Sequence, residues 1–293
     1  MLWIALTIAA APLQVARNAL QRGLVEEAGP WGATLVRFLF GLPFALAMFA
    51  IVAVFTPTAD PAFTPRFWLM VSAGALGQVL ATAALLVAMR RAGFAVATFM
   101  QQSSLPLAAL MGLAVFGDPL SPGAWLGVGA TTAGLCVLSW PRTGTTGGLW
   151  LGSLLGLLSG AAFAVALNGY RHAGLALEPD HPIYAALASV CVAQTMQSLG
   201  LGAWLALRRP ADLAAVGRAW RQSLGAGFCG SAASACWFSA LALAPAGMVR
   251  AVGVIEAPIA ATAGRRLFNE RLSARQILGG GVTAIGVVLT ALG

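Results

Sequence analysis

One carboxylate stands inside an apolar stretch of this 293-residue chain. Glu256 lies between Ile255 and Ala257, and no other acidic residue occurs close to it in the sequence. A carboxylate in an apolar medium needs either a cationic partner or a proton, because an unpaired buried charge is costly. Two roles therefore stay open for Glu256: a structural ion pair, or proton coupling through a pKa raised by burial.

The cations that could pair with Glu256 are Arg17, Arg37 and Arg250. Arg250 lies six residues earlier in the same expected helix, which places it about 120° away around an unbroken helix. Arg250 is therefore a poor direct partner on the sequence alone. We expect an ion pair with a cation from another segment, such as Arg37, if the role is structural.

A polar stripe marks the first apolar segment. Gln14, Arg17, Asn18 and Gln21 follow the i, i+3, i+4, i+7 spacing of one helix face. In lipid such a face must contact protein or a water-filled cavity. Arg17 could instead extend to the headgroup region, but Gln14 and Asn18 share its face and are too short to do so. We expect this stripe to line a pathway.

The elements that must position these residues are membrane helices. Hydrophobic residues make up 59% of the chain and charged residues 9%, with a mean hydropathy of +0.84, far from a soluble composition. The net charge of +8 does not indicate nucleic-acid binding, because the arginines are scattered between apolar runs. All 17 basic residues are arginine. The absence of lysine from the sequence excludes Schiff-base chemistry and a Walker motif.

The sequence does not predict an enzyme. An intramembrane enzyme needs a nucleophile with a base, or a metal site. The expected spans contain no histidine, no HExxH motif and no paired aspartates. No catalytic residue, metal ligand or cofactor is therefore predicted.

Apolar runs divide the chain into ten segments long enough to cross a bilayer of ordinary thickness. The polar connections between them carry turn residues, such as Glu26 to Pro30 and Glu178 to Asp180. The ten expected spans are 3–21, 33–55, 67–89, 93–116, 123–140, 148–169, 182–206, 220–243, 246–267 and 273–292.

The sequence repeats itself at an offset of 152 residues, the separation of Pro106 from Pro258. Small residues recur at this offset as two ridges that we expect to serve close helix packing, Gly127, Thr131 and Gly134 in the first copy and Gly279, Thr283 and Gly286 in the second. The repeat predicts two halves of five spans, residues 1–141 and 148–293. Because five is an odd number, two halves with the same order of spans must insert with opposite orientations. We therefore expect an all-α integral membrane protein of ten transmembrane helices, built as two inverted five-helix repeats. Such pseudo-symmetry is typical of a secondary transporter, and a non-transporting scaffold would not require it.

The arginine distribution predicts an orientation. Arg66 and Arg171 fall on the face that holds the N-terminus, and most of the others fall on the opposite face. The positive-inside rule would then place both termini outside the cell.

Two motifs resemble the EamA domain, which occurs in tandem in the drug/metabolite transporter superfamily. Each has a proline in a small-residue helix, an acidic turn ending in Leu-Ser, and a glycine-rich helix. The second copy has Glu256 where the first has Ser104, so the two halves are chemically unequal. Arg37, early in the second span, also fits the family pattern. The motifs are Pro106, Gly117-Asp118-Pro119-Leu120-Ser121 and Gly127 in the first copy, and Glu256-Ala257-Pro258, Asn269-Glu270-Arg271-Leu272-Ser273 and Gly279 in the second.

This resemblance implies a multi-pass protein of the inner membrane that handles a small-molecule substrate and is compatible with a monomer. It also implies cytoplasmic termini, which conflicts with the orientation that the arginine distribution predicts. It also implies that spans one, three, four, six, eight and nine line a central cavity. For a single Ser or Thr, hydrogen bonding between helices is the alternative role. The expected lining residues are Gln14, Arg17, Asn18, Gln78, Thr82, Thr98, Met100, Gln101, Ser104, Asn168, Ser234 and Trp237.

The neutral amides of this set, together with Phe99, Met100, Tyr170 and Trp237, favour a zwitterion with an apolar or aromatic side chain. We therefore expect an exporter of neutral or aromatic amino acids, or of similar amphipathic solutes, that works by alternating access. A transporter of drugs or quaternary cations, or one of nucleotide sugars, is the alternative.

Overall fold

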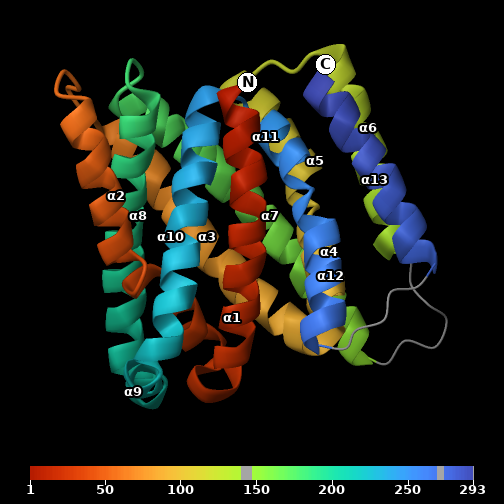
Figure 1. The fold of residues 1–293 in the computed structure, drawn as a ribbon, viewed down its shortest axis with the longest axis horizontal. Coiled ribbons are helices and arrows are strands. Elements are labelled where there is room, and N and C mark those ends of the chain that lie inside the picture. The colour runs from red at the N-terminus through yellow and green to blue at the C-terminus, as the bar shows by residue number, and fades with distance from the viewer. Residues whose placement is uncertain (140–146, 269–273, 293) are drawn as a thin grey trace. The chain divides into compact units, whose positions relative to one another are not determined.

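A computed structural model describes residues 1–139, 147–268 and 274–292, and within these ranges the chain is helical with no β-strand (Figure 1). The second acidic turn, at residues 269–273, and the connection at residues 142–144 lie outside the described residues. The elements are α1 (Leu2–Leu39), α2 (Leu42–Phe55), α3 (Pro65–Ala92), α4 (Phe94–Gln101), α5 (Ser104–Met111), the π-helical turn η1 (Gly112–Phe116), α6 (Pro122–Ser139), α7 (Gly147–Leu177), α8 (Pro182–Arg208), α9 (Pro210–Arg218), α10 (Trp220–Leu243), α11 (Ala246–Gly253), α12 (Glu256–Phe268) and α13 (Ala274–Leu292).

Seven helical segments of the described chain are long and apolar enough to cross a membrane. The protein is therefore a multi-pass membrane protein, as predicted. The count of ten spans stays a prediction. The seven segments are Leu2–Phe55, Pro65–Ala92, Phe94–Phe116, Trp150–Leu177, Pro182–Arg208, Trp220–Leu243 and Ala246–Leu267.

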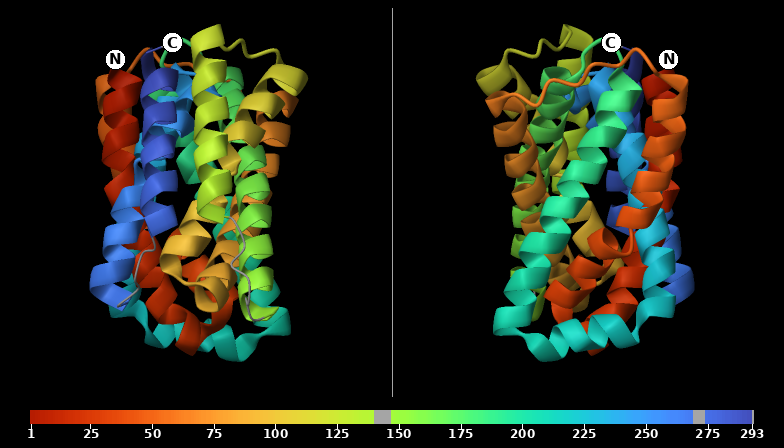
Figure 2. Two further views of the ribbon diagram at one scale, coloured as in Figure 1. Left: turned by 90° about the vertical axis from the view of Figure 1, so that its right-hand side faces the viewer. Right: turned by 90° about the vertical axis from the view of Figure 1, so that its left-hand side faces the viewer.

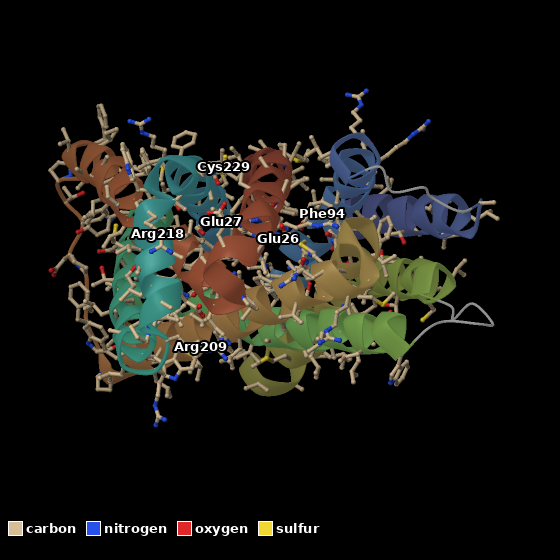
Figure 3. All side chains as sticks on the ribbon, turned by 90° about the horizontal axis from the view of Figure 1, so that it is seen from below. Glu26, Glu27, Phe94, Arg209, Arg218 and Cys229 are labelled. Atoms are coloured by element: carbon tan, nitrogen blue, oxygen red, sulfur yellow. The ribbon has the colours of Figure 1, made fainter. Side chains whose placement is uncertain are left out.

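The first expected connection is helical instead. Helix α1 continues through Glu26 and Glu27, which are exposed on it (Figure 3). Its one non-helical residue is Gly29, with φ 66° and ψ 172°. Glycine tolerates this left-handed φ, and the following Pro30 disfavours the α conformation for the residue before it. The predicted turn is thus compressed into a kink at one residue.

Two further boundaries differ from the sequence prediction. Helix α7 extends to Leu177, beyond the expected end of its span at residue 169, so His172 is a buried helical residue. The short helix α9 was not predicted, and it lies across the ends of α8 and α10 (Figure 2). The side chains of Arg209, before its first residue, and Arg218, its last residue, are exposed (Figure 3).

The chain packs as two compact units. Unit 1 consists of Met1–Val79 and Ala166–Ala244, and unit 2 consists of Leu80–Val165 and Pro245–Gly293. Helices α3 and α7 contribute to both units. Each unit therefore combines segments from both expected sequence halves, 1–141 and 148–293.

Unit 1 is built around the contact of α1 with α10, with α2 and α8 packed together beside it. Two glycines allow the closest approach. A Cβ at Gly227 would lie 2.5 Å from the carbonyl carbon of Phe40. Gly41 follows Phe40 in the break between α1 and α2, and its carbonyl oxygen accepts a hydrogen bond of 2.7 Å from Ser231 Oγ. The break is thus held against α10.

In unit 2, α6 and α13 form an extensive contact and lie side by side (Figure 1). The predicted ridges of small residues meet here. A Cβ at Gly134 would clash with Thr283, and one at Gly286 would clash with Thr131. These two contacts are related by the 152-residue offset. The sequence prediction that the ridges serve close helix packing is confirmed.

Candidate functional site: paired helix breaks and buried arginines

Both sequence repeats contain a helix that breaks at the same position. Helix α4 ends at Gln101 and α5 begins at Ser104, whereas α11 ends at Gly253 and α12 begins at Glu256. Adding 152 to the first pair of positions gives the second pair. Within the described residues, the sequence repeat is therefore matched by a repeat in the backbone, because the helix breaks at the equivalent position in each copy of the motif.

The prolines two residues beyond each break explain it. Proline lacks the N–H that would donate to the carbonyl four residues earlier. Pro106 therefore leaves the carbonyl of Gln102 without its helical donor, and Leu105 N donates to it at 2.9 Å. In the second repeat Ala257 N donates in the same way to Val254 O at 2.8 Å. Each break is a tightened turn with i to i+3 hydrogen bonds.

The two broken helices run antiparallel in unit 2. Helix α4 packs against α12 and α5 packs against α11, so the first half of each broken helix lies beside the second half of the other. Apolar side chains fill the contact, including Phe99 and Leu105 from one helix and Val254 and Ala257 from the other. The breaks thus form the centre of a buried layer.

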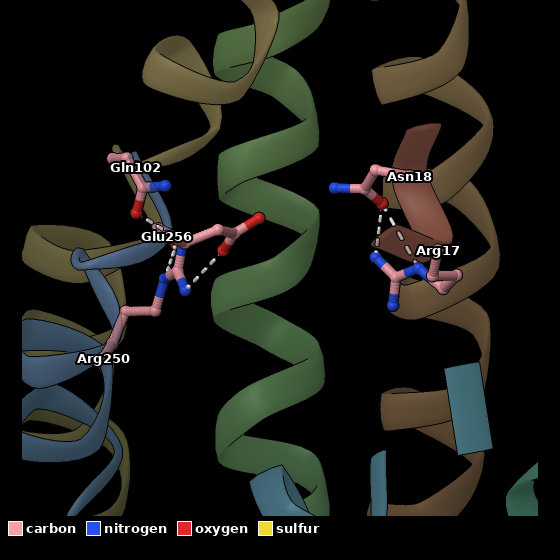
Figure 4. A network of polar contacts seen from close by, with 6 residues as sticks. Arg17, Asn18, Gln102, Arg250 and Glu256 are labelled. Atoms are coloured by element: carbon pink, nitrogen blue, oxygen red, sulfur yellow. Dashed lines mark hydrogen bonds and ion pairs between the residues drawn. The ribbon is translucent and has the colours of Figure 1, made fainter. Parts of the chain in front are cut away.

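Arg250 joins the two breaks (Figure 4). Its Nε donates to Ser104 Oγ at 2.7 Å, and its Nη2 donates to Gln102 Oε1 at 2.5 Å. Its Nη1 lies 3.4 Å from Glu256 Oε2. The expectation that Arg250 is a poor partner for Glu256 is therefore wrong, because the break at residues 254–255 removes the rotation that an unbroken helix would impose. Glu256 is ion-paired with Arg250, and the pairing of Glu256 with Arg37 stays a prediction.

A row of glycines in α7, which was not among the sequence predictions, lets that helix approach the first break. A Cβ at Gly156 would lie 2.5 Å from Met100 Cβ, and one at Gly160 would lie 2.9 Å from Gln101 O. Together with Gly152 they form a small-residue motif with four-residue spacing. This motif in the sequence could have predicted a close contact between helices.

A second polar cluster lies in unit 1. Arg17 donates from Nε and Nη2 to Asn18 Oδ1 at 3.2 and 2.6 Å (Figure 4). Arg37 donates from Nη2 to Ser234 Oγ at 3.4 Å. Arg17 has no exposed surface and Arg37 is 2% exposed. Arg17 therefore does not extend to the headgroup region, which was the alternative role.

An amide and tyrosine network joins three helices of unit 1. Tyr170 OH donates to Gln78 Oε1 at 2.8 Å. Gln197 Nε2 donates to Gln78 Oε1 at 2.8 Å, and it lies 3.1 Å from Tyr170 OH. Gln197 was not among the predicted site residues. An amide inside an apolar span was the signal that could have found it.

All of the predicted lining residues are buried, as are Arg37 and Glu256. Thr98 donates to Phe94 O within its own helix, which favours a structural role for that hydroxyl. The expectation that these residues share one cavity stays a prediction. Unit 1 holds Gln14, Arg17, Asn18, Arg37, Gln78, Asn168, Ser234 and Trp237, and unit 2 holds Thr82, Thr98, Met100, Gln101, Ser104 and Glu256.

Outside the spans, one carboxylate ties two connections of unit 1 together. Glu178 Oε2 accepts a hydrogen bond from Asp60 N at 2.7 Å, and Oε1 accepts one from Asp180 N at 3.2 Å. His181 Nδ1 lies 3.5 Å from Glu178 Oε1. The bond from Asp60 N is the main reason that the pKa of Glu178 lies below its ordinary value.

Comparisons with known proteins place the chain among transporters. The sequence profile of the EamA-like transporter family matches residues 1–140 and again residues 150–292. Among curated proteins no match was found. The chain superimposes on a crystal structure with a TM-score of 0.63 and 18% identity, covering 98% of this chain and 96% of that one. At this identity the likeness concerns the fold alone.

Proposed function

Because the chain belongs to the EamA-like transporter family of the drug/metabolite transporter superfamily, we propose that it is a secondary transporter that exports small metabolites across the inner membrane by alternating access. Its substrates are neutral or aromatic amino acids, or amphipathic solutes of similar size.

The pair of helix breaks bridged by Arg250 is the observation that carries this proposal. Discontinuous helices related by a repeat are typical of transporter binding regions. Regular helical hydrogen bonds are already missing near residues 102 and 254. Each helix can therefore bend at its break without losing the hydrogen bonds of a complete turn. Arg250 contacts Gln102 and Ser104 at one break and Glu256 beyond the other. Movement at one break is thereby linked to movement at the other.

Helix packing also supports ten spans in two inverted repeats. The segment Leu2–Phe55 has 54 residues, enough for two spans of about 20 residues each. Helices α6 and α13 coincide with two further expected spans. Antiparallel packing of the two broken helices is what halves inserted with opposite orientations would produce. We therefore retain the ten-span inverted architecture as part of the proposal.

The interior of unit 1 supports an amphipathic substrate. Amides of Gln78 and Gln197 lie beside the Tyr170 hydroxyl, and the Tyr170 ring packs on Phe238 with centroids 4.0 Å apart. Polar donors next to aromatic rings suit an amino acid with an apolar side chain.

Counterflow in proteoliposomes tests this function. The purified protein would be reconstituted with a high internal concentration of each candidate solute, and uptake of the same radiolabelled solute from outside would be followed. Neutral and aromatic amino acids should show transient accumulation, whereas quaternary cations and nucleotide sugars should not. Liposomes without protein are the control for leakage. Absence of counterflow for every solute in the panel would contradict the proposal.

A further inference from the structure

Four exposed arginines flank the short helix α9 in unit 1. They are Arg208, the last residue of α8, Arg209, between α8 and α9, Arg218, the last residue of α9, and Arg221, the second residue of α10. Helix α9 lies across the ends of α8 and α10 (Figure 2), and both of these helices are long and apolar enough to cross a membrane. Arginines at the ends of membrane spans lie at the level of the lipid headgroups.

The inner face of α9 is held against other helices of unit 1. Val216 is buried, and Leu213 packs on a cluster that includes Leu35 and Leu205. A Cβ at Gly32 of α1 would lie 3.2 Å from Val216 Cγ2, so the two helices are in close contact there. Helix α9 has nine residues, which corresponds to a length of about 14 Å. One pair of arginines therefore stands at each end of a fixed helix, with room for more than one headgroup between them.

The outer face of α9 is open and carries no acidic side chain. Ala211, Ala214 and Gly217 are exposed on it, and a Cβ at Gly217 would meet nothing within 4 Å. Asp212 is the one acidic residue of α9, and its half-buried Oδ2 lies 3.6 Å from Arg209 Nη1. Small side chains leave the neighbouring guanidinium groups accessible to a large anion.

Three of the four arginines have no counter-charge in the described part of the chain. Arg208, Arg218 and Arg221 form no ion pair with any described residue. Helix α1, which packs on α9, exposes Glu26 and Glu27 (Figure 3), but these two carboxylates form no ion pair within the described residues either. Like charges repel one another, and a layer of anions against the arginines would lower that energy.

Exposed apolar side chains accompany the arginines. Leu207 is 82% exposed, and Trp220 is 48% exposed. The Trp220 ring also contacts Arg221, with Cζ 5.3 Å from the ring centroid. Tryptophan is enriched where the headgroups of a membrane meet its acyl chains. Cations beside apolar groups at this level match a phospholipid, whereas a free anion would contact the charges alone.

We propose that α9 and its four flanking arginines form a docking surface for the headgroups of anionic phospholipids. Guanidinium groups bind phosphate oxygens through charge-assisted hydrogen bonds, and clusters of basic residues beside membrane spans attract anionic lipids. Leu207 and Trp220 contact the lipid below its phosphate. This inference is independent of the proposed transport function.

Thermal unfolding of the full chain in a neutral detergent at low salt tests the surface. The probes are a short-chain phosphatidylglycerol, the phosphatidylcholine with the same acyl chains, inorganic phosphate and hexaglutamate. Phosphatidylglycerol should raise the unfolding temperature at the lowest concentration, and added salt should weaken its effect. Equal stabilisation by phosphatidylcholine would overturn the inference, because the headgroup charge would then not be recognised. Equal stabilisation by inorganic phosphate or by hexaglutamate would also overturn it, in favour of a free anion or an acidic protein segment.

Neutralising the arginines should weaken binding of the anionic lipid. Arg218→Gln should raise the phosphatidylglycerol concentration needed for half of the stabilisation about fivefold, which corresponds to about 1 kcal/mol for one arginine near an anionic surface. The double variant Arg208→Gln/Arg218→Gln should raise it about thirtyfold. The matched control Arg66→Gln removes an exposed arginine of α3 and should bind as the wild type does.

Asp212→Asn tests the surface in the opposite direction. It removes the carboxylate that pairs with Arg209, so phosphatidylglycerol should act at a lower concentration than it does on the wild type. A gain in affinity cannot result from misfolding. Wild-type affinity in both Arg208→Gln/Arg218→Gln and Asp212→Asn would overturn the docking surface.

Discussion

Arg250 and Glu256 form an ion pair of 3.4 Å across a break in their own helix, although they are six residues apart in the sequence. Both side chains are almost completely buried. The same guanidinium group also contacts Gln102 and Ser104 at the matching break. A single cation thus connects the corresponding points of the two repeats.

Neutralising Glu256 should destabilise the protein, because it leaves a buried guanidinium without its carboxylate. We expect Glu256→Gln to lower the free energy of unfolding by about 3–5 kcal/mol. In the Arg250→Gln/Glu256→Gln double variant the loss should be smaller than the sum of the single losses. Thermal unfolding in detergent measures all three variants, and the exposed Glu27→Gln is the matched control. A stable Glu256→Gln protein that exchanges substrate normally but ignores a pH gradient would assign Glu256 to proton coupling instead.

Substitution of two glycines of α6 should change the stability of the protein differently, because only one of them lies at the contact with α13. A methyl group at Gly134 would clash with Thr283, whereas one at Gly129 would meet nothing within 4 Å. Gly134→Ala should therefore destabilise by about 1–3 kcal/mol. Gly129→Ala should be neutral or stabilise by up to about 1 kcal/mol through helix propensity. Equal unfolding temperatures for the two variants would show that the helices do not pack in this way.

The two tyrosines of the chain provide a test of the amide network. Tyr170→Phe removes the hydroxyl that donates to Gln78 and lies beside Gln197 Nε2. The expected loss is about 1 kcal/mol, as for other hydrogen bonds inside membrane proteins. Tyr184 packs on Phe49 through its ring, and the control Tyr184→Phe keeps that contact. A Tyr170→Phe protein as stable as the Tyr184→Phe protein would contradict the network.

Glu178 should make the connections of unit 1 sensitive to acid. Its pKa is lower in the folded protein than in the unfolded chain, mainly because Asp60 N donates to it. The stabilisation is therefore present above the unfolded pKa of about 4.3 and is lost as the pH falls through the lower, folded value. Glu178→Gln should be less stable than the wild type at pH 7, and the difference should shrink towards pH 3. A difference that does not change with pH would contradict this role.

The sequence predicted the features that depend on composition and on the repeat. Apolar runs predicted the membrane segments, and the 152-residue offset predicted the matched ridges of α6 and α13. Burial of the stripe containing Gln14, Arg17 and Asn18 followed from its helical spacing. These predictions succeeded because hydropathy and helical periodicity are properties of short stretches of sequence. The repeat places equivalent residues in both halves, so a contact between equivalent helices can also be predicted.

The features that the sequence did not predict depend on where helices bend. Arg250 was judged a poor partner for Glu256 because an unbroken helix was assumed between the two residues, whereas the helix breaks there. The kink at Gly29 was taken for a longer connection, although one residue with positive φ is enough. Gln197 was missed because its partners, Gln78 and Tyr170, come from other helices and are distant in sequence.

The central claim is that the polar interior of unit 1 opens in turn to each side of the membrane. Asn18 is 1% exposed in the structure, so a cysteine at this position reacts only if the protein opens. The background would lack the native Cys136, Cys191, Cys229 and Cys236, with a cysteine in place of the exposed Glu27 as the accessible control. We expect Asn18→Cys to react with a small membrane-impermeant thiol reagent from either side, and substrate to change the rate. Full labelling of the control, with Asn18→Cys unlabelled from both sides, would show that the stripe is packing and would contradict alternating access through this unit.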